Sequence, residues 1–171
     1  GREVACSHPI LPVERLINID TKVVQYRLAF MRSRTNRRWE SVIVNASTIS
    51  KAREITALSE MNISVTSTTA SALVDFLNDV CNLNYDIIPE TKSIGRLGYI
   101  PEHGFMPFVD GVTFDGDASF RNLYGCVKSK GSVITWCDIA EECRKMSVTA
   151  RILLAASFAS PILSIVGSLP F

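Results

Sequence analysis

The sequence predicts a mixed α+β protein: an antiparallel β-meander with two helices, followed by a β-rich irregular segment and C-terminal helices. Three observations lead to this expectation. Apolar residues alternate with polar ones over much of residues 14–44, they recur at helical spacing over 47–82 and again over 132–166, and glycine and proline interrupt residues 85–125. Hydrophobic residues make up 47% and charged residues 20%, so a core of normal size needs no metal or disulfide.

The meander is expected to contain three strands, at residues 14–19, 23–31 and 38–44. Alternation and β-branched or aromatic content support each of them. In the second strand, one face would carry Val24, Tyr26, Leu28 and Phe30. The polar residues 32–37 would form the loop between the second and third strands.

Two helices are expected after the meander. The first covers residues 47–60, with Ser47 as its cap and a narrow apolar stripe formed by Ile49, Ala52, Ile55 and Leu58 or Ser59. Asn62 would end it. The second covers residues 67–82, and its buried face would contain Leu73, Phe76, Leu77 and Val80.

The second half of the chain is expected to begin with short strands and to end with helices. The strands fit residues 94–100, 105–109 and 112–114, and the helices fit 132–145, capped by Ser132, and 147–166. A soft boundary near residues 84–92 divides the chain into a β-β-β-α-α unit, 1–84, and a second part, 85–171. One continuous domain is the alternative.

Charge and cysteine content limit the function classes. The net charge is +1, which gives no global attraction to nucleic acid, although residues 1–60 hold ten basic and six acidic residues, a net +4. The five cysteines show no CxxC spacing, and no secretory signal is recognisable, so we expect a cytoplasmic protein with reduced cysteines and no metal site.

The predicted loop between the second and third strands carries the basic cluster. Arg32, Arg34, Arg37 and Arg38 surround its tip. The planar guanidinium group suits phosphate, so a protruding β-ribbon of this kind can contact a DNA backbone. A solvated hairpin tip is the alternative interpretation.

Three further residues permit a metal-assisted site. Asp115 and Asp117 lie in a glycine-rich stretch, and His103 precedes them. Paired carboxylates can hold magnesium or act as acid and base, but Asp-Gly is also a common turn dipeptide and no nucleophile motif accompanies His103. We therefore expect no catalytic residue in this chain.

The apolar stretch 147–166 is long enough to suggest a membrane helix. Arg151, Pro161 and the recurring serines argue against this interpretation. We expect instead a helix that packs against other protein, or that drives self-association where it is left uncovered.

Three segments of the second half resemble the family called domain of unknown function 927. Arg96 to Phe108, "RLGYIPEHGFMPF", is similar to its Leu-Gly-Trp…Phe segment, with Tyr99 in place of the usual Trp. Gly131 to Lys145, "GSVITWCDIAEECRK", resembles its Gly-Ser…Trp helix, and Ala150 to Gly167 resembles its Ala-rich helix. The resemblance covers about residues 14–167.

This resemblance implies a setting for the chain. Family members occur in phages, plasmids and other mobile elements, in helicase- or primase-like proteins, and carry a phosphate-binding loop soon after the Ala-rich helix. The sequence contains no G-x-x-x-x-G-K-[ST]. The resemblance therefore implies a non-catalytic N-terminal accessory region, without a cofactor, of a DNA-replication ATPase that uses ATP and magnesium in a motor domain beyond Phe171. DNA is the expected partner of the whole protein. The alternatives are a small metal-assisted hydrolase or a purely protein-interaction domain.

Overall fold

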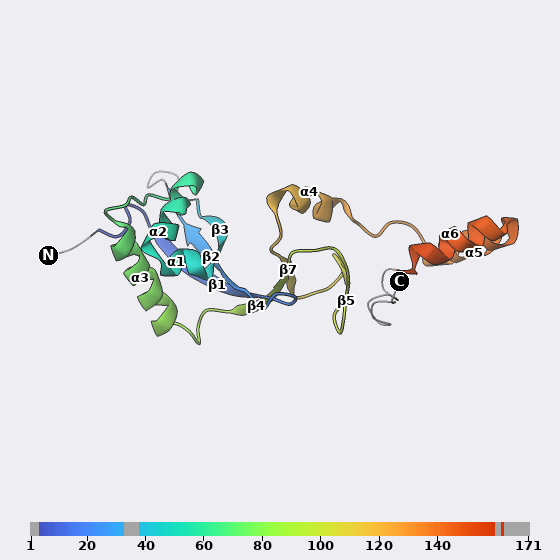
Figure 1. The fold of residues 1–171 in the computed structure, drawn as a ribbon, viewed down its shortest axis with the longest axis horizontal. Coiled ribbons are helices and arrows are strands. Elements are labelled where there is room, and N and C mark those ends of the chain that lie inside the picture. The colour runs from blue at the N-terminus through green and yellow to red at the C-terminus, as the bar shows by residue number, and fades with distance from the viewer. Residues whose placement is uncertain (1–3, 33–37, 160–161, 163–171) are drawn as a thin grey trace, which may run out of the picture. The chain divides into compact units, whose positions relative to one another are not determined.

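A computed structural model describes residues 4–32, 38–159 and 162 (Figure 1). The chain forms two compact units. Unit 1 contains Gly1–Ile94 and Gly111–Asp115, and unit 2 contains Gly95–Asp110 and Gly116–Phe171. Each unit is therefore built from two separate pieces of the sequence.

Unit 1 is organised around one five-stranded sheet. Its strands are β1 (Ile10–Asn18), β2 (Val24–Phe30), β3 (Glu40–Asn45), β4 (Glu90–Ile94) and β7 (Val112–Phe114), in the spatial order β3-β2-β1-β4-β7. The first three pair antiparallel, which confirms the predicted meander. β4 pairs parallel to β1, and β7 pairs parallel to β4. A division of the chain at residues 84–85 would place β4 and β7 in one part and β1, β2 and β3 in the other, although all five strands belong to the same sheet.

β1 begins at Ile10, four residues before the predicted start, and includes Pro12. Proline has no N–H group to donate to a ladder, so it is tolerated where one side of a strand has no partner. β4 pairs with β1 only from Arg15 onward, and the β1–β2 register shifts between Pro12 and Glu14. The bulge and the short reach of β4 together accommodate the proline.

The predicted helix 47–60 is instead three short pieces. They are α1 (Ala46–Ser50), α2 (Ala52–Ile55) and the 3-10 helix η1 (Thr56–Met61). Lys51 between the first two is extended, and Asn45 rather than Ser47 occupies the N-cap of α1. Ile49 and Ile55 are both buried, although a continuous helix would place residues six apart about 120° from each other around its axis; the break at Lys51 lets both reach one core. Asn62 ends η1 in a left-handed conformation with φ of 63°, as predicted.

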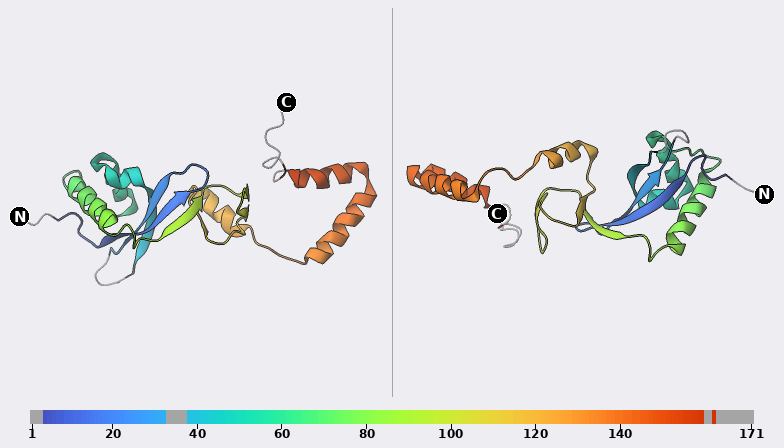
Figure 2. Two further views of the ribbon diagram at one scale, coloured as in Figure 1. Left: turned by 90° about the horizontal axis from the view of Figure 1, so that it is seen from below. Right: turned by 180° about the vertical axis from the view of Figure 1, so that it is seen from behind.

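α3 (Ala70–Leu83) is a regular helix beside the sheet, on the same side as α1 and α2 (Figure 2). Its buried residues are Ala70, Leu73, Val74, Leu77 and Cys81. The prediction that Phe76 lies on the buried face is wrong, because its side chain is 39% exposed. Each helical residue turns by about 100°, which places Phe76 beside the buried arc rather than within it. The core of unit 1 also includes Ile10, Leu28, Phe30, Val44, Ile49, Ile55 and Leu58.

Unit 2 contains a short hairpin and three helices. β5 (Gly98–Ile100) and β6 (Gly104–Met106) pair antiparallel, so the predicted strand 94–100 is the end of β4 and a separate β5. α4 (Ala118–Cys126) was not predicted. α5 (Val133–Met146) is capped by Ser132 as expected, and α6 (Val148–Ser157) is capped by Ser147. Residues 160–161 and 163–166 of the predicted last helix lie outside the described residues.

Candidate functional site

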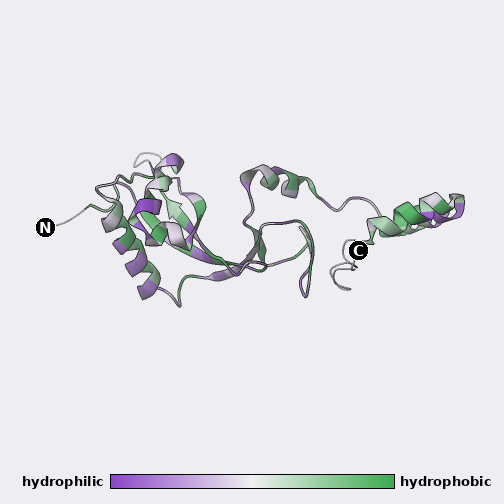
Figure 3. Ribbon diagram, viewed as in Figure 1, coloured by the Kyte–Doolittle hydropathy of each residue, from purple (hydrophilic) through white to green (hydrophobic). Residues whose placement is uncertain are grey.

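The helical hairpin formed by α5 and α6 exposes large apolar side chains on both of its helices. Neither helix contains a buried residue. Met146 is 78% exposed and Ile152 is 62% exposed, and apolar residues occur on both helices (Figure 3). Exposed apolar surface of this kind marks an interaction site in a folded protein.

α6 is mostly apolar, with Thr149, Arg151 and Ser157 as its polar residues. Its inner face contributes Leu154 and Ala155 to the space facing α5, while Val148, Ile152 and Leu153 lie on its exposed surface. α5 covers only one face of α6, and the apolar side chains on the outer face are exposed.

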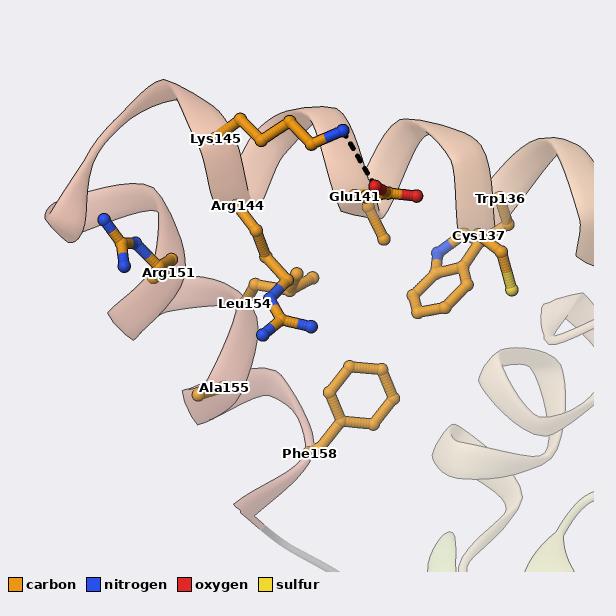
Figure 4. A pocket seen from close by; sticks show the side chains of 10 residues that line it. Trp136, Cys137, Glu141, Arg144, Lys145, Arg151, Leu154, Ala155 and Phe158 are labelled. Carbon is orange, nitrogen blue, oxygen red and sulfur yellow. Dashed lines mark ion pairs between the residues drawn. The ribbon is translucent and has the colours of Figure 1, made fainter.

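A groove of about 960 Å³ lies between the two helices (Figure 4). Its aromatic end is formed by Trp136 of α5 and Phe158, the C-cap of α6. The two rings meet edge to face, with centroids 5.7 Å apart and planes at 79°. Arrangements of this kind contribute roughly 0.5–1.5 kcal/mol beyond burial, so the contact helps to hold the hairpin together.

Two arginines also line the groove, one along its length and one near the turn. Arg144 extends from α5 into the groove, and Arg151 of α6 lies closer to the turn that joins the helices (Figure 4). Lys145 pairs with Glu141 at 2.7 Å, whereas no ion pair is found for Arg144 or Arg151 among the described residues. Arg144, Lys145 and Arg151 carry positive charge and Glu141 carries negative charge, so these four side chains give the groove a net charge of +2.

Asp115, one of the residues of the alternative metal-assisted site, joins three strands of unit 1. Its carboxylate accepts hydrogen bonds from Asn18 Nδ2, at 3.0 and 3.2 Å, and from Ser93 Oγ, at 2.6 Å. Asn18 ends β1, Ser93 lies near the end of β4, and Asp115 follows β7. Because these strands are parallel, their carboxyl ends meet at one edge of the sheet.

Hydrogen bonds from backbone N–H groups also stabilise this edge of the sheet. Ser93 is fully buried, and its carbonyl accepts from the backbone N–H of Ile19 at 2.8 Å. The Asn18 side-chain oxygen accepts from the N–H groups of Asp20 and Thr21. The Asn18–Ser93–Asp115 cluster is therefore an internally satisfied polar network, which stabilises the edge rather than presenting open ligand positions.

Asp117 and His103 also have local roles. The carboxylate of Asp117 accepts from the N–H of Ser119 at 2.7 Å and caps α4, and the backbone and side-chain hydrogen bonds with Ser119 lower the pKa of Asp117. His103 lies in the turn between β5 and β6, where its backbone N–H donates a hydrogen bond to the carbonyl oxygen of Ile100. Among the described residues, no three His, Cys, Asp or Glu side chains are grouped to hold a metal ion.

Only part of the predicted basic cluster is described. Arg34 and Arg37 lie outside the described residues, whereas Arg32 and Arg38 flank them. Arg32 forms an ion pair with Glu40, with a distance of 3.1 Å from Nε to Oε1. The hydrogen bond from Arg32 lowers the pKa of Glu40. Glu40 therefore offsets part of the positive charge that the sequence places at this end of the meander.

Several of these contacts were not predicted from the sequence. Asn18 and Ser93 carry no motif, and each lies far from Asp115 along the chain. The α5–α6 groove had a partial signal in Arg151, a charged residue within an apolar stretch. The groove itself requires α6 to fold back toward α5, and the chain turns at Ser147, which caps α6.

No helix among the described residues is both long and apolar enough to cross a membrane. The family model described as "Domain of unknown function (DUF927)" matches residues 1–170. No curated protein matches the chain. The family match covers both units and the α5–α6 hairpin.

Proposed function

Since the chain belongs to the DUF927 family, we propose that it is a non-catalytic accessory region of a helicase-like, DNA-replication ATPase of mobile elements. In this role it positions DNA, contacts other subunits or couples them to the motor. The motor would supply ATP and magnesium chemistry, and the whole protein would act in the cytoplasm. The resemblance of the sequence to this family is the reason for proposing this class of parent protein.

The α5–α6 hairpin is the observation that supports an accessory role most directly. A pair of helices with no buried residue, one of them mostly apolar, is suited to docking rather than to isolation in water. We propose that this surface contacts the motor domain or a neighbouring subunit. In a chain that lacks such a partner, the same surface drives self-association.

A protein-interaction role without nucleic acid is the second candidate. The Arg32–Glu40 pair supports it, because a guanidinium group held by a carboxylate is less available to phosphate. Arg27 is likewise paired, with Glu14 at 2.6 Å. The two candidates differ in whether the basic loop binds DNA.

Binding to single- and double-stranded DNA at several salt concentrations separates them. If Arg32, Arg34, Arg37 and Arg38 each contact a phosphate, the log–log salt slope should be about −3 to −4. Replacing all four by alanine should abolish that binding, whereas Lys128→Ala should leave it unchanged. Binding that survives the fourfold change removes the DNA-positioning role and leaves the protein-interaction role.

ATP turnover tests the non-catalytic assignment. The purified 171-residue chain should show no hydrolysis above a mock purification from the same host. Turnover that copurifies with the chain through two unrelated chromatographic steps would contradict the proposed function as a whole. Loss of DNA binding alone would not.

A further inference from the structure

The α5–α6 groove has two chemically different ends, and these describe the partner that fits it. We propose that the groove receives a helix of another protein domain, with an apolar side chain at one end and a carboxylate about two turns away. The inference rests on the proposed docking role of the hairpin, and it specifies the chemistry of the partner.

Helix geometry sets the spacing. The Arg144 side chain reaches from α5 back to Leu154, so Arg151, beside the turn, marks the far end of the groove (Figure 4). On α6, Phe158 and Arg151 are seven residues apart, or about 10 Å along the axis. A helix lying along the groove would therefore present its apolar residue to the aromatic pair and its carboxylate about seven residues away.

The floor of the groove favours a helix over a small polar ligand. Ala140, Leu154 and Ala155 line the groove with short or apolar side chains, and the Arg144 guanidinium is the polar group that reaches among them (Figure 4). A third helix packs its side-chain ridge into a groove of this kind.

Charge decides between a peptide and a nucleic acid. Arg144 and Arg151 are the cations of the groove for which no ion pair is found among the described residues; Arg144 lies beside Leu154, and Arg151 lies near the turn (Figure 4). α5 also carries three acidic residues, Asp138, Glu141 and Glu142, so the hairpin has no continuous basic track. A polyphosphate strand needs such a track along several nucleotides, whereas one or two carboxylates on a helix need only these arginines.

The charges also favour a different chain over a second copy. Across α5 and α6, three acidic residues are balanced by Arg144, Lys145 and Arg151. In a dimer of two copies, the arginines of one hairpin would face those of the other and repel them. A helix that carries carboxylates but no lysine or arginine avoids this repulsion between cations.

Fluorescence polarisation with designed peptides tests the inference on the full chain. Two alanine-based helical peptides would be labelled, each with a leucine pair and, seven residues away, either a glutamate pair or a lysine pair in the same positions. We expect the glutamate peptide to bind about tenfold more tightly than the lysine peptide. Both orders of leucine and charge along the peptide would be measured, and preference for glutamate in either order meets the expectation.

Charge reversal provides the decisive control. The double variant Arg144→Glu/Arg151→Glu should reverse the preference, so that the lysine peptide binds better. Trp136→Ala should weaken both peptides equally, and Lys128→Glu, an exposed change outside the groove, should change neither. Circular dichroism would establish that each variant keeps the helical content of the parent.

Three outcomes would overturn the inference. The first is binding that does not depend on peptide charge. The second is a sixteen-nucleotide oligo-dT that displaces the peptide and responds to the same variants, which would assign the groove to nucleic acid. The third is a dimer in sedimentation that Trp136→Ala dissolves and that the glutamate peptide does not disrupt, which would assign it to a second copy. None of these results bears on the absence of ATP turnover or on DNA binding by the basic loop, so failure of this inference is distinguishable from failure of the proposed function.

Discussion

Replacing Asp115 by alanine should destabilise unit 1 substantially. The change removes the acceptor of hydrogen bonds from Asn18 Nδ2 and from Ser93 Oγ, the latter only 2.6 Å long. A buried donor left without a partner costs about 1–3 kcal/mol. Ser93 is fully buried and loses its acceptor outright, whereas Asn18 lies nearer the surface, where water can replace part of the loss.

The two losses together predict a decrease of about 2–4 kcal/mol in the free energy of unfolding of unit 1. Asp115→Asn keeps the shape and one acceptor oxygen but loses the charge, so we expect about 1–2 kcal/mol. Urea denaturation followed by the fluorescence of Trp39 measures this quantity. The measurement uses a Trp136→Phe background, because the chain has two tryptophans and only Trp39 belongs to unit 1.

Asp117→Ala is the matched control. It removes a carboxylate from the same Asp-Gly-Asp stretch, but one that caps α4 in unit 2. It should move the Trp39 transition by less than about 0.5 kcal/mol. In the Asp115→Ala background, Ser93→Ala should cost little further, because the hydroxyl group has already lost its acceptor. An Asp115→Ala variant within 0.5 kcal/mol of its background would refute the reasoning.

Three further changes test other parts of unit 1. Leu28→Ala removes a fully buried side chain from the core and should cost about 2–5 kcal/mol in the same urea assay; a cost below 1 kcal/mol would place Leu28 outside the core. Glu14→Gln tests pH dependence. Burial raises the pKa of Glu14, but hydrogen bonds from Arg27 and Thr91 and the charge of Arg27 outweigh it, so the folded-state pKa is lowered. The Glu14 carboxylate therefore stabilises the fold above its unfolded pKa, and this contribution is lost as the pH falls through the folded value. Glu14→Gln should accordingly cost about 1–2 kcal/mol at pH 7 and progressively less in acid, and a cost that does not vary between pH 7 and pH 3 would contradict the assignment. Glu40→Gln frees Arg32 from its ion pair and should strengthen DNA binding by the basic loop about two- to fivefold at low salt, as measured by fluorescence anisotropy; unchanged or weaker binding would argue against the loop as a DNA contact.

Local patterns were sufficient for several elements. The alternation from Val24 to Phe30 predicted β2 and its core-facing side chains, because residues on one strand face the core at every second position. Asn62 and Ser132 were correctly assigned as helix boundaries, since left-handed backbone and side-chain capping are properties of a few neighbouring residues. The resemblance to the DUF927 family was likewise visible from short motifs in order, and the family match confirms it.

Other features depended on contacts between distant residues. α4 was missed because its capping residue, Asp117, stands in an Asp-Gly-Asp stretch that is equally typical of a turn. The break at Lys51 follows from the need of both Ile49 and Ile55 to reach one core, and no local signal at Lys51 indicates it. Tertiary packing therefore overrode a pattern that was compatible with one continuous helix.

The sequence alone determined the α+β class, the meander, the helix capped by Ser132 and the family. Only the tertiary structure decided that β4 and β7 join the meander in parallel, that Asp115 meets Asn18 across 97 positions of sequence, and that Trp136 and Phe158 close one end of a groove. The physical reason is the range of the interactions. Caps and periodicity act over one or two turns of chain, whereas strand partners, buried polar networks and helix–helix grooves form between segments whose proximity no local pattern encodes.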